Sequence, residues 1–165
     1  MKISPRHVIG LLIVTGLTGL AWAAGTRVFQ ATVYSAVSGK EISAMLSTEG
    51  YRPTLGKADD GDPQIKFKVQ GKEIYIDFYD CNKSEFCGSL NVSTGWALKT
   101  KLDAAKLNQW NADNRYIRVY TDEEKDPFLE DDIDLDGGAT MNNVKEFVKT
   151  YVSQLDDFMA EFKLR

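Results

Sequence analysis

Apolar residues recur at two different spacings along the chain, and each change of spacing marks an expected element. Alternation of apolar and polar residues is typical of strands that bury one face, whereas spacings of three and four residues are typical of amphipathic helices. The pattern predicts helices at 39–49, 101–114 and from Thr140 to Phe162, and strands at 65–69, 74–78, 86–92, 115–122 and 128–136. A short run at 51–55 contains Pro53 and fits an edge position.

Local signals predict several ends of these elements. Ser38 and Glu41 form a capping-box pattern before the first helix. Asn114 is expected to end the second helix in the left-handed conformation, which asparagine tolerates. Gly71 and Lys72 are expected to form a two-residue hairpin turn of type II′, which requires glycine at its first position. Three residues of the second helix are expected to face inward: Leu102, Ala105 and Trp110.

Together these elements predict an α+β fold in the order helix, three strands, helix, two strands, helix (α-β-β-β-α-β-β-α). Tight turns between alternating strands imply an antiparallel sheet, and the amphipathic helices imply that one face of it is covered. The other face should be wet. Charged residues and tyrosines are expected on it: Lys66, Lys68, Tyr75, Asp77, Tyr79, Tyr116, Arg118, Tyr120, Glu130, Asp132 and Asp134.

The first 23 residues have the pattern of a secretory signal peptide. Lys2 and Arg6 precede an apolar stretch at 8–20, and small residues stand at Ala21 and Ala23, the two positions that a signal peptidase reads. We therefore expect cleavage near Ala23 and a periplasmic or secreted product.

An uncleaved signal that anchors the chain in a membrane is the alternative, although the apolar stretch is short and broken by glycine. The remaining chain is predicted to comprise an extension at 24–33 and a single domain at 34–165. No segment after the signal is apolar enough to insert into a membrane.

Charge and composition exclude several functions. Without Lys2 and Arg6 the 20 basic residues become 18 against 24 acidic ones, and the formal charge changes from −4 to −6. Such an acidic chain is unlike nucleic-acid-binding proteins, which need a basic surface to contact phosphates. The one histidine, His7, lies in the signal, which removes histidine-based nucleophile pairs and histidine metal ligands. We expect a protein that is not an enzyme and has no cofactor, with a histidine-free hydrolase as an alternative.

The two cysteines, Cys81 and Cys87, are separated by five residues. Export to an oxidising compartment makes a disulfide between them the expected state. A thioredoxin-like redox pair would have two intervening residues, so the spacing favours a structural crosslink.

Asp132, Asp134 and Asp136, followed by Gly137, match the first half of a calcium-binding loop. The second half fails, because Asn143 occupies the position that needs a bidentate glutamate. Alternation with apolar residues also gives the three aspartates a simpler role on the wet face of a strand. We therefore expect no metal site, and these three residues remain a weak calcium candidate.

Tyrosines interleaved with charges on the wet face suggest a surface for a partner polypeptide, because tyrosine offers a large contact area with a polar tip. The candidate residues are Tyr75, Tyr79, Tyr116, Arg118 and Tyr120. A solvated face stabilised by cross-strand pairs is the simpler alternative.

The block from Trp110 to Gly138 carries a family resemblance. Trp110-Asn111 followed by Asn114-Arg115, the alternating strand through Tyr120, and an acidic strand ending in Gly137-Gly138 before a long helix resemble the YbjN family of bacterial sensory transduction regulators. The resemblance covers 34–165, and it implies a fold similar to that of class I type III secretion chaperones. Because chaperones of that fold often form dimers, it also allows a homodimer. It implies no catalytic or ligand-binding residues.

The sequence therefore predicts an exported protein that binds another protein or peptide and acts as a regulatory module in the bacterial envelope. A calcium-stabilised structural protein of the envelope is the main alternative.

Overall fold

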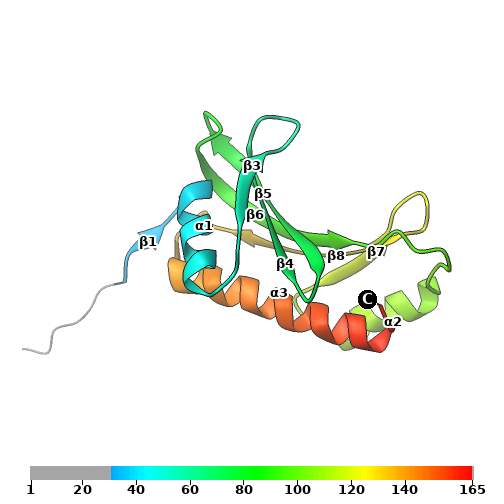
Figure 1. Cartoon of the computed structure of the whole chain (residues 1–165). Helices are drawn as coiled ribbons and strands as arrows, with labels where there is room; N and C mark the ends of the chain where they lie inside the picture. Colours follow the sequence, from blue (N-terminus) through cyan, green and yellow to red (C-terminus); the bar gives the residue numbers. More distant parts are fainter. Residues whose placement is uncertain (1–30, 165) are drawn as a thin grey trace, which may run out of the picture. The chain divides into compact units, whose positions relative to one another are not determined.

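A computed structural model describes residues 31–164, which belong to one compact unit (Figure 1). The predicted signal peptide and most of the predicted extension lie outside the described residues. The helices are α1 (Gly39–Thr48), α2 (Ala104–Asp113) and α3 (Met141–Glu161). The strands are β1 (Val33–Tyr34), β2 (Val37–Ser38), β3 (Thr54–Lys57), β4 (Pro63–Val69), β5 (Lys72–Asn82), β6 (Phe86–Gly95), β7 (Arg118–Thr121), β8 (Pro127–Asp134) and β9 (Ala139–Thr140).

The main sheet has seven strands, with the order β3-β4-β5-β6-β8-β7 and with β2 paired to β6. All its pairings are antiparallel. Figure 1 shows α1, α2 and α3 on the same side of this sheet. The prediction of an α+β fold with helices on one face is confirmed. The predicted edge run corresponds to β3, which begins three residues later than the pattern indicated, at Thr54.

Alternate residues of the central strands form the core together with one stripe of each helix. Ile65, Ile76 and Val92 are inaccessible to solvent on the helix side of the sheet. The predicted stripe of α3 packs against them, and Tyr151 at its centre is completely buried. The Tyr151 hydroxyl donates a 2.9 Å hydrogen bond to the Leu129 carbonyl of β8, which satisfies the one polar atom of that side chain. No helix in the described part of the chain is both long and apolar enough to cross a membrane.

The predicted starts of the first and last helices are confirmed, whereas α2 begins at Ala104 instead of Lys101. The Glu41 amide donates to the Ser38 hydroxyl, and the Ser38 amide donates to the Glu41 carboxylate at 2.8 Å. Thr140 forms the same reciprocal arrangement with Asn143 at the start of α3. The asparagine that replaces the calcium-loop glutamate is therefore the reciprocal partner in a capping box.

Several local predictions are wrong. The β4–β5 turn consists of Gln70 and Gly71, at φ of 49° and 82°, so it is a type I′ turn placed one residue before the predicted one. Asn114 does cap α2, but in an extended conformation with φ of −113°. Ala105 is exposed, and Leu107 takes the inward position beside Trp110.

The first two described strands, β1 and β2, attach the beginning of the domain to later strands by backbone pairing. β1 pairs with β9 immediately before α3, and β2 pairs with the first residues of β6. At the β1–β9 contact, Gly138 has a φ of 101°, and an added Cβ there would lie 2.3 Å from Val33 Cγ1. Gly138 is therefore needed both for its backbone conformation and for the close approach of β1.

Cys81 and Cys87 face each other directly across β5 and β6 and form the expected disulfide. Cys87 is fully buried, and it also faces Val37 of β2. The bond therefore closes the β5–β6 hairpin at the point where this hairpin meets the strand that leads into α1.

Replacing both cysteines with alanine should lower the free energy of unfolding by about 2 kcal/mol, because the bond restricts a short loop of the unfolded chain. The melting temperature should fall by about 5–10 °C, measured by circular dichroism. Chemically reduced wild-type protein should melt like the double variant. A melting temperature that a reductant leaves unchanged would contradict a stabilising role.

Candidate partner-binding face

The side of the sheet opposite the helices, called the polar face below, is built from rows of residues that face one another across the strands. One row contains Lys66, Tyr75, Ser93, Glu130 and Arg118, which lie on β4, β5, β6, β8 and β7. A second row contains Gln64, Asp77, Asn91 and Asp132, and a third contains Tyr79, Ser89 and Asp134. The pairing thus brings together the predicted face residues of these strands.

The middle of the polar face is low and acidic. β6 contributes the short side chains of Ser89, Asn91 and Ser93 as a floor. Carboxylates from β5 and β8 stand on both sides of it: Glu73, Asp77, Asp80, Glu130, Asp132 and Asp134. Most of their hydrogen bonds come from neutral groups, such as Gln64 to Asp77 at 2.7 Å and Asn91 to Asp132 at 2.9 Å. Neutral donors leave the negative charge of these carboxylates in place.

Tyr79 is the most accessible aromatic residue on β5, with 48% of its surface exposed. Partial burial raises the pKa of its hydroxyl, and the nearby charges of Asp77, Asp132, Glu130 and Asp60 raise it further. The charges of four carboxylates therefore act on this exposed side chain. A ring in such a field is suited to contact a cationic side chain, which gains from both the carboxylates and the ring face.

At the far edge of the sheet, Tyr120 lies stacked on Phe128 with ring centroids 5.6 Å apart and is 42% exposed. Phe128 in turn covers Gly95, where an added Cβ would lie 2.6 Å from the Phe128 ring. The sequence pattern missed Phe128 as a face residue, although it has the same parity along β8 as Glu130 and Asp132. The stacked rings of Tyr120 and Phe128 therefore form an aromatic surface at the β7 end of the polar face.

Arg118 is the cation at the β7 edge of the polar face. Its guanidinium lies 2.5 Å from Glu130 and 3.4 Å from Asp132. The hydrogen bond to Glu130 raises the pKa of Arg118, and the charges of both acids add to that effect. Arg118 therefore pairs with acids of β8, whereas no cation of the described residues lies at ion-pair distance from Glu73 or Asp77 of β5.

Tyr75 and Tyr116 are less suited to partner contact than predicted. The Tyr75 hydroxyl donates to Glu73 at 2.7 Å, and the Lys66 ammonium lies 5.1 Å from its ring, so this side chain is already engaged. Tyr116 does not belong to a strand, because β7 begins two residues later. It has a φ of 77° and is 65% exposed, with the Arg115 guanidinium over its ring. The predicted strand at 115–122 is therefore too long at its start.

The three aspartates of the calcium candidate have other roles. Asp132 accepts hydrogen bonds from Asn91 and faces Arg118, while Asp134 accepts the amide of Asp136 at 2.8 Å in the turn that follows β8. In residues 31–164, no three acidic, cysteine or histidine side chains form a group that would hold a metal ion. The structure gives no geometric support to calcium binding at this turn.

The motif at the end of α2 has a structural role that the sequence pattern did not reveal. The Asn111 side chain accepts the Val119 amide at 2.8 Å and donates to the Val119 carbonyl at 2.9 Å, so it closes the outer edge of β7. Asn114 donates its side-chain amide to the Trp110 carbonyl at 3.0 Å, and the Trp110 ring packs against Phe158 of α3. The motif therefore joins α2, β7 and α3.

Replacing Asn111 with alanine should lower the free energy of unfolding by about 1–3 kcal/mol, because two backbone groups of Val119 lose their partners. Urea unfolding measures this loss. The Val119 amide should also exchange faster with deuterium. Gln109→Ala on the exposed side of the same helix is the control and should change stability by less than about 0.5 kcal/mol. Equal stability of the two variants would refute the edge-closing role.

Asp131 is a second residue that the pattern missed. It stands between Leu129 and Ile133 and faces Val92, so its carboxyl lies on the helix side of the sheet. Burial raises its pKa to about 6, against the lowering effect of the Asp132 amide, which donates to it. No cation of the described residues pairs with it at ion-pair distance. The alternation of β8 is the signal that would have identified it.

The raised pKa of Asp131 predicts that ionisation of this carboxyl destabilises the domain. The carboxyl is protonated in both folded and unfolded states below about pH 4, and stability is lost as the pH rises through about 6, because the folded state then contains a poorly solvated charge. Asp131→Asn should therefore stabilise the protein by about 1 kcal/mol at pH 7.5, a value reduced for partial exposure. At about pH 4 the gain should vanish.

Urea unfolding of the wild type and of Asp131→Asn across this pH range measures the effect. Glu124→Gln removes a charge from an exposed turn and serves as the control. If Asp131→Asn gains the same stability at both ends of the range, ionisation of Asp131 is not the cause.

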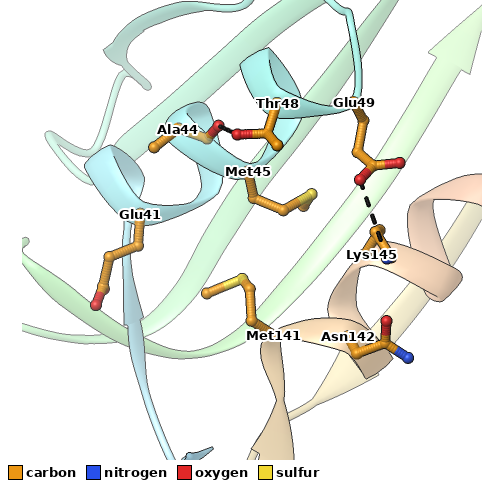
Figure 2. A pocket seen from close by; sticks show the side chains of 8 residues that line it. All are labelled: Glu41, Ala44, Met45, Thr48, Glu49, Met141, Asn142 and Lys145. Carbon is orange, nitrogen blue, oxygen red and sulfur yellow. Dashed lines mark hydrogen bonds and ion pairs between the residues drawn. The ribbon is translucent and has the colours of Figure 1, made fainter.

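A separate hollow of about 440 Å³ lies between α1 and the start of α3, with Met45 and Met141 facing each other across it (Figure 2). Glu49 at its rim forms ion pairs with Lys145 at 4.0 Å and Lys149 at 3.0 Å. These pairs hold α1 against α3.

The structure thus defines an α+β domain with an open antiparallel sheet, a helix-covered core and an acidic, tyrosine-bearing polar face. The family model of YbjN, described as "Putative bacterial sensory transduction regulator", matches residues 38–164. The chain therefore belongs to the YbjN family, which confirms the predicted resemblance. No curated protein matches the chain significantly.

Proposed function

We propose that this YbjN domain is a non-enzymatic regulatory module that binds a partner polypeptide across the polar face of its sheet. The observation that carries the proposal is the placement of Tyr79 and Tyr120, both more than two-fifths exposed, on a sheet face that carries the carboxylates of β5 and β8. Aromatic rings on rigid strands lose little entropy on binding and give large contact areas. The family description as a regulator agrees with a binding role.

The charge of the polar face selects the partner chemistry. Six carboxylates flank the floor, and Arg118 pairs with two of them. The β5 side keeps its negative charge around the Tyr79 ring. A partner that places lysine or arginine side chains over Tyr79 would be complementary, and such contacts should weaken at high salt.

The site of action that we propose is the bacterial envelope. A leader with the pattern of a signal peptide precedes the domain, and the disulfide between Cys81 and Cys87 is compatible with an oxidising compartment. Cleavage near Ala23 would release the domain into the periplasm or the medium, and an uncleaved leader would anchor it to the membrane.

Crosslinking and affinity capture from the envelope test the proposal. A Tyr79→Ser/Tyr120→Ser variant should recover at least about tenfold less partner than the wild type, because two exposed aromatic contacts are lost. Tyr116→Ser is the matched control, since Tyr116 is more exposed but lies outside the strands. Equal capture by wild type and double variant would exclude the polar face as the binding surface.

Location is measured separately by cell fractionation and by sequencing the N-terminus of the purified protein. A chain that begins at Ala24 in the periplasmic or secreted fraction would agree with cleavage near Ala23. An intact leader in the cytoplasmic fraction would contradict the proposed location while leaving the binding surface as a separate question.

A further inference from the structure

The two outer edges of the main sheet differ in how their backbone groups are satisfied. At β7, the Asn111 side chain bonds both outward groups of Val119. At the other edge, β3 pairs with β4 alone within residues 31–164, and all four of its residues are exposed. A closed edge and an open edge therefore stand at opposite ends of one sheet.

The turn between β4 and β5 determines which β3 groups point outward. Its two-residue loop makes Val69 and Lys72 a hydrogen-bonded pair, and bonding alternates along β4 from that pair. The residues of β4 that bond to β3 are therefore Lys66 and Gln64, which face Thr54 and Gly56. Leu55 and Lys57, the alternate residues, direct their N–H and C=O groups away from the sheet.

A hollow of about 390 Å³ lies beside this open edge. Gly39, Leu55 and Pro63 give it apolar surface, and Leu55 is 40% exposed. An added Cβ on Gly39 would lie 2.7 Å from Leu55 Cδ1, so the glycine lets the start of α1 approach β3 closely.

The side of the hollow opposite β3 is formed by a crosslinked hairpin, and two lysines stand at its rim. Ser84 and Glu85 form that side at the tip of the β5–β6 hairpin, which the disulfide closes. Lys40 and Lys57 stand at the rim, against the single acid Glu85. The hollow therefore suits an apolar side chain with an acidic neighbour.

We propose that β3 accepts an extended segment of a partner polypeptide as an added strand. The segment would pair with the outward groups of Leu55 and Lys57, as in strand addition to an exposed edge. Residues two apart on an added strand point to the same side, so an apolar side chain faces Leu55 over the hollow and an acidic one faces Lys57.

Charge selects a different polypeptide over a second copy of this chain. Pairing of β3 with its own copy would gather Lys40 and Lys57 of both copies along one edge, and the mutual repulsion of these like charges would weaken the pair. An acidic segment has the complementary charge. The edge is distinct from the polar face, so this proposal stands independently of the proposed function.

The test uses the full chain and a phage-displayed library of random peptides of about nine residues as the probe. Enriched peptides should contain an apolar and an acidic residue two positions apart. When a selected peptide binds, hydrogen exchange should slow at the amides of Leu55 and Lys57. Selection without this pattern, or protection elsewhere, would overturn the proposal. Protection that rises with protein concentration alone would assign the edge to a second copy and would also overturn it.

Variants of Lys57 separate the backbone contact from the charge. Lys57→Pro removes an outward N–H that the β3–β4 pairing does not use, and it should weaken peptide binding at least about tenfold. Lys57→Gln keeps the N–H and should weaken binding only a few-fold, while Lys57→Glu should reverse the preference to basic peptides. Tyr79→Ser should leave peptide binding unchanged. Equal affinity of Lys57→Pro and Lys57→Gln would show that the peptide does not pair with the strand.

Discussion

The packing of α3 against one face of the sheet is the constraint on which the rest of the structure depends. Six buried residues of this helix cover the core side of the strands. At roughly 1.5–3 kcal/mol for each large apolar side chain, their burial is comparable to the whole net stability of a small domain. The Tyr151 hydroxyl then fixes the position of the helix by its bond to the Leu129 carbonyl. Because one face of the sheet is committed in this way, only the opposite face and the two edges remain available for contact with other molecules.

The two edges of the sheet differ in whether their outward backbone groups have partners. The Asn111 amide takes the place of a neighbouring strand at β7, and the rings of Tyr120 and Phe128 cover the same end of the polar face. At β3 the backbone stays open beside a basic hollow. The polar face is acidic, so the two surfaces favour partners of opposite charge. The two proposed surfaces are separate, so polypeptides bound to them as proposed would not compete.

Most of the architecture follows from local patterns in the sequence. The capping box at Ser38, the helix start at Thr140 and the stripe of α3 require only residues close together in the chain, and these predictions are confirmed. The errors arise where distant pairing decides the outcome. The position of the Gln70–Gly71 turn depends on which residues of β4 and β5 face each other. A turn one residue later would shift every partner by two residues, so that Ile65 would face Phe78 instead of Ile76. The short start of β7 likewise depends on Asn111, eight residues before Val119.

The site was less predictable than the fold, because it depends on which strands lie side by side. Alternation placed Tyr79, Arg118 and Asp132 on one face, but it could not show that the pairing of β8 with β6 brings Glu130 and Asp132 near enough to affect the Tyr79 hydroxyl. The role of Asp131 also depends on a neighbour, since the helix that covers it comes later in the chain. The Trp110–Arg115 motif therefore joins elements of the scaffold, and it alone does not define a binding surface.

The pairing of β1 with β9 has a mechanical consequence. A pull on the chain before Val33 would act first on a two-residue ladder, and it would reach the N-cap of α3 through Ala139 and Thr140. Short ladders pulled from one end open bond by bond and resist little force. If the leader tethers the domain to a surface, this ladder would open first, while the disulfide holds the neighbouring hairpin closed. The β1–β9 ladder would thus extend under a weak pull, while the crosslinked β5–β6 hairpin would keep its structure.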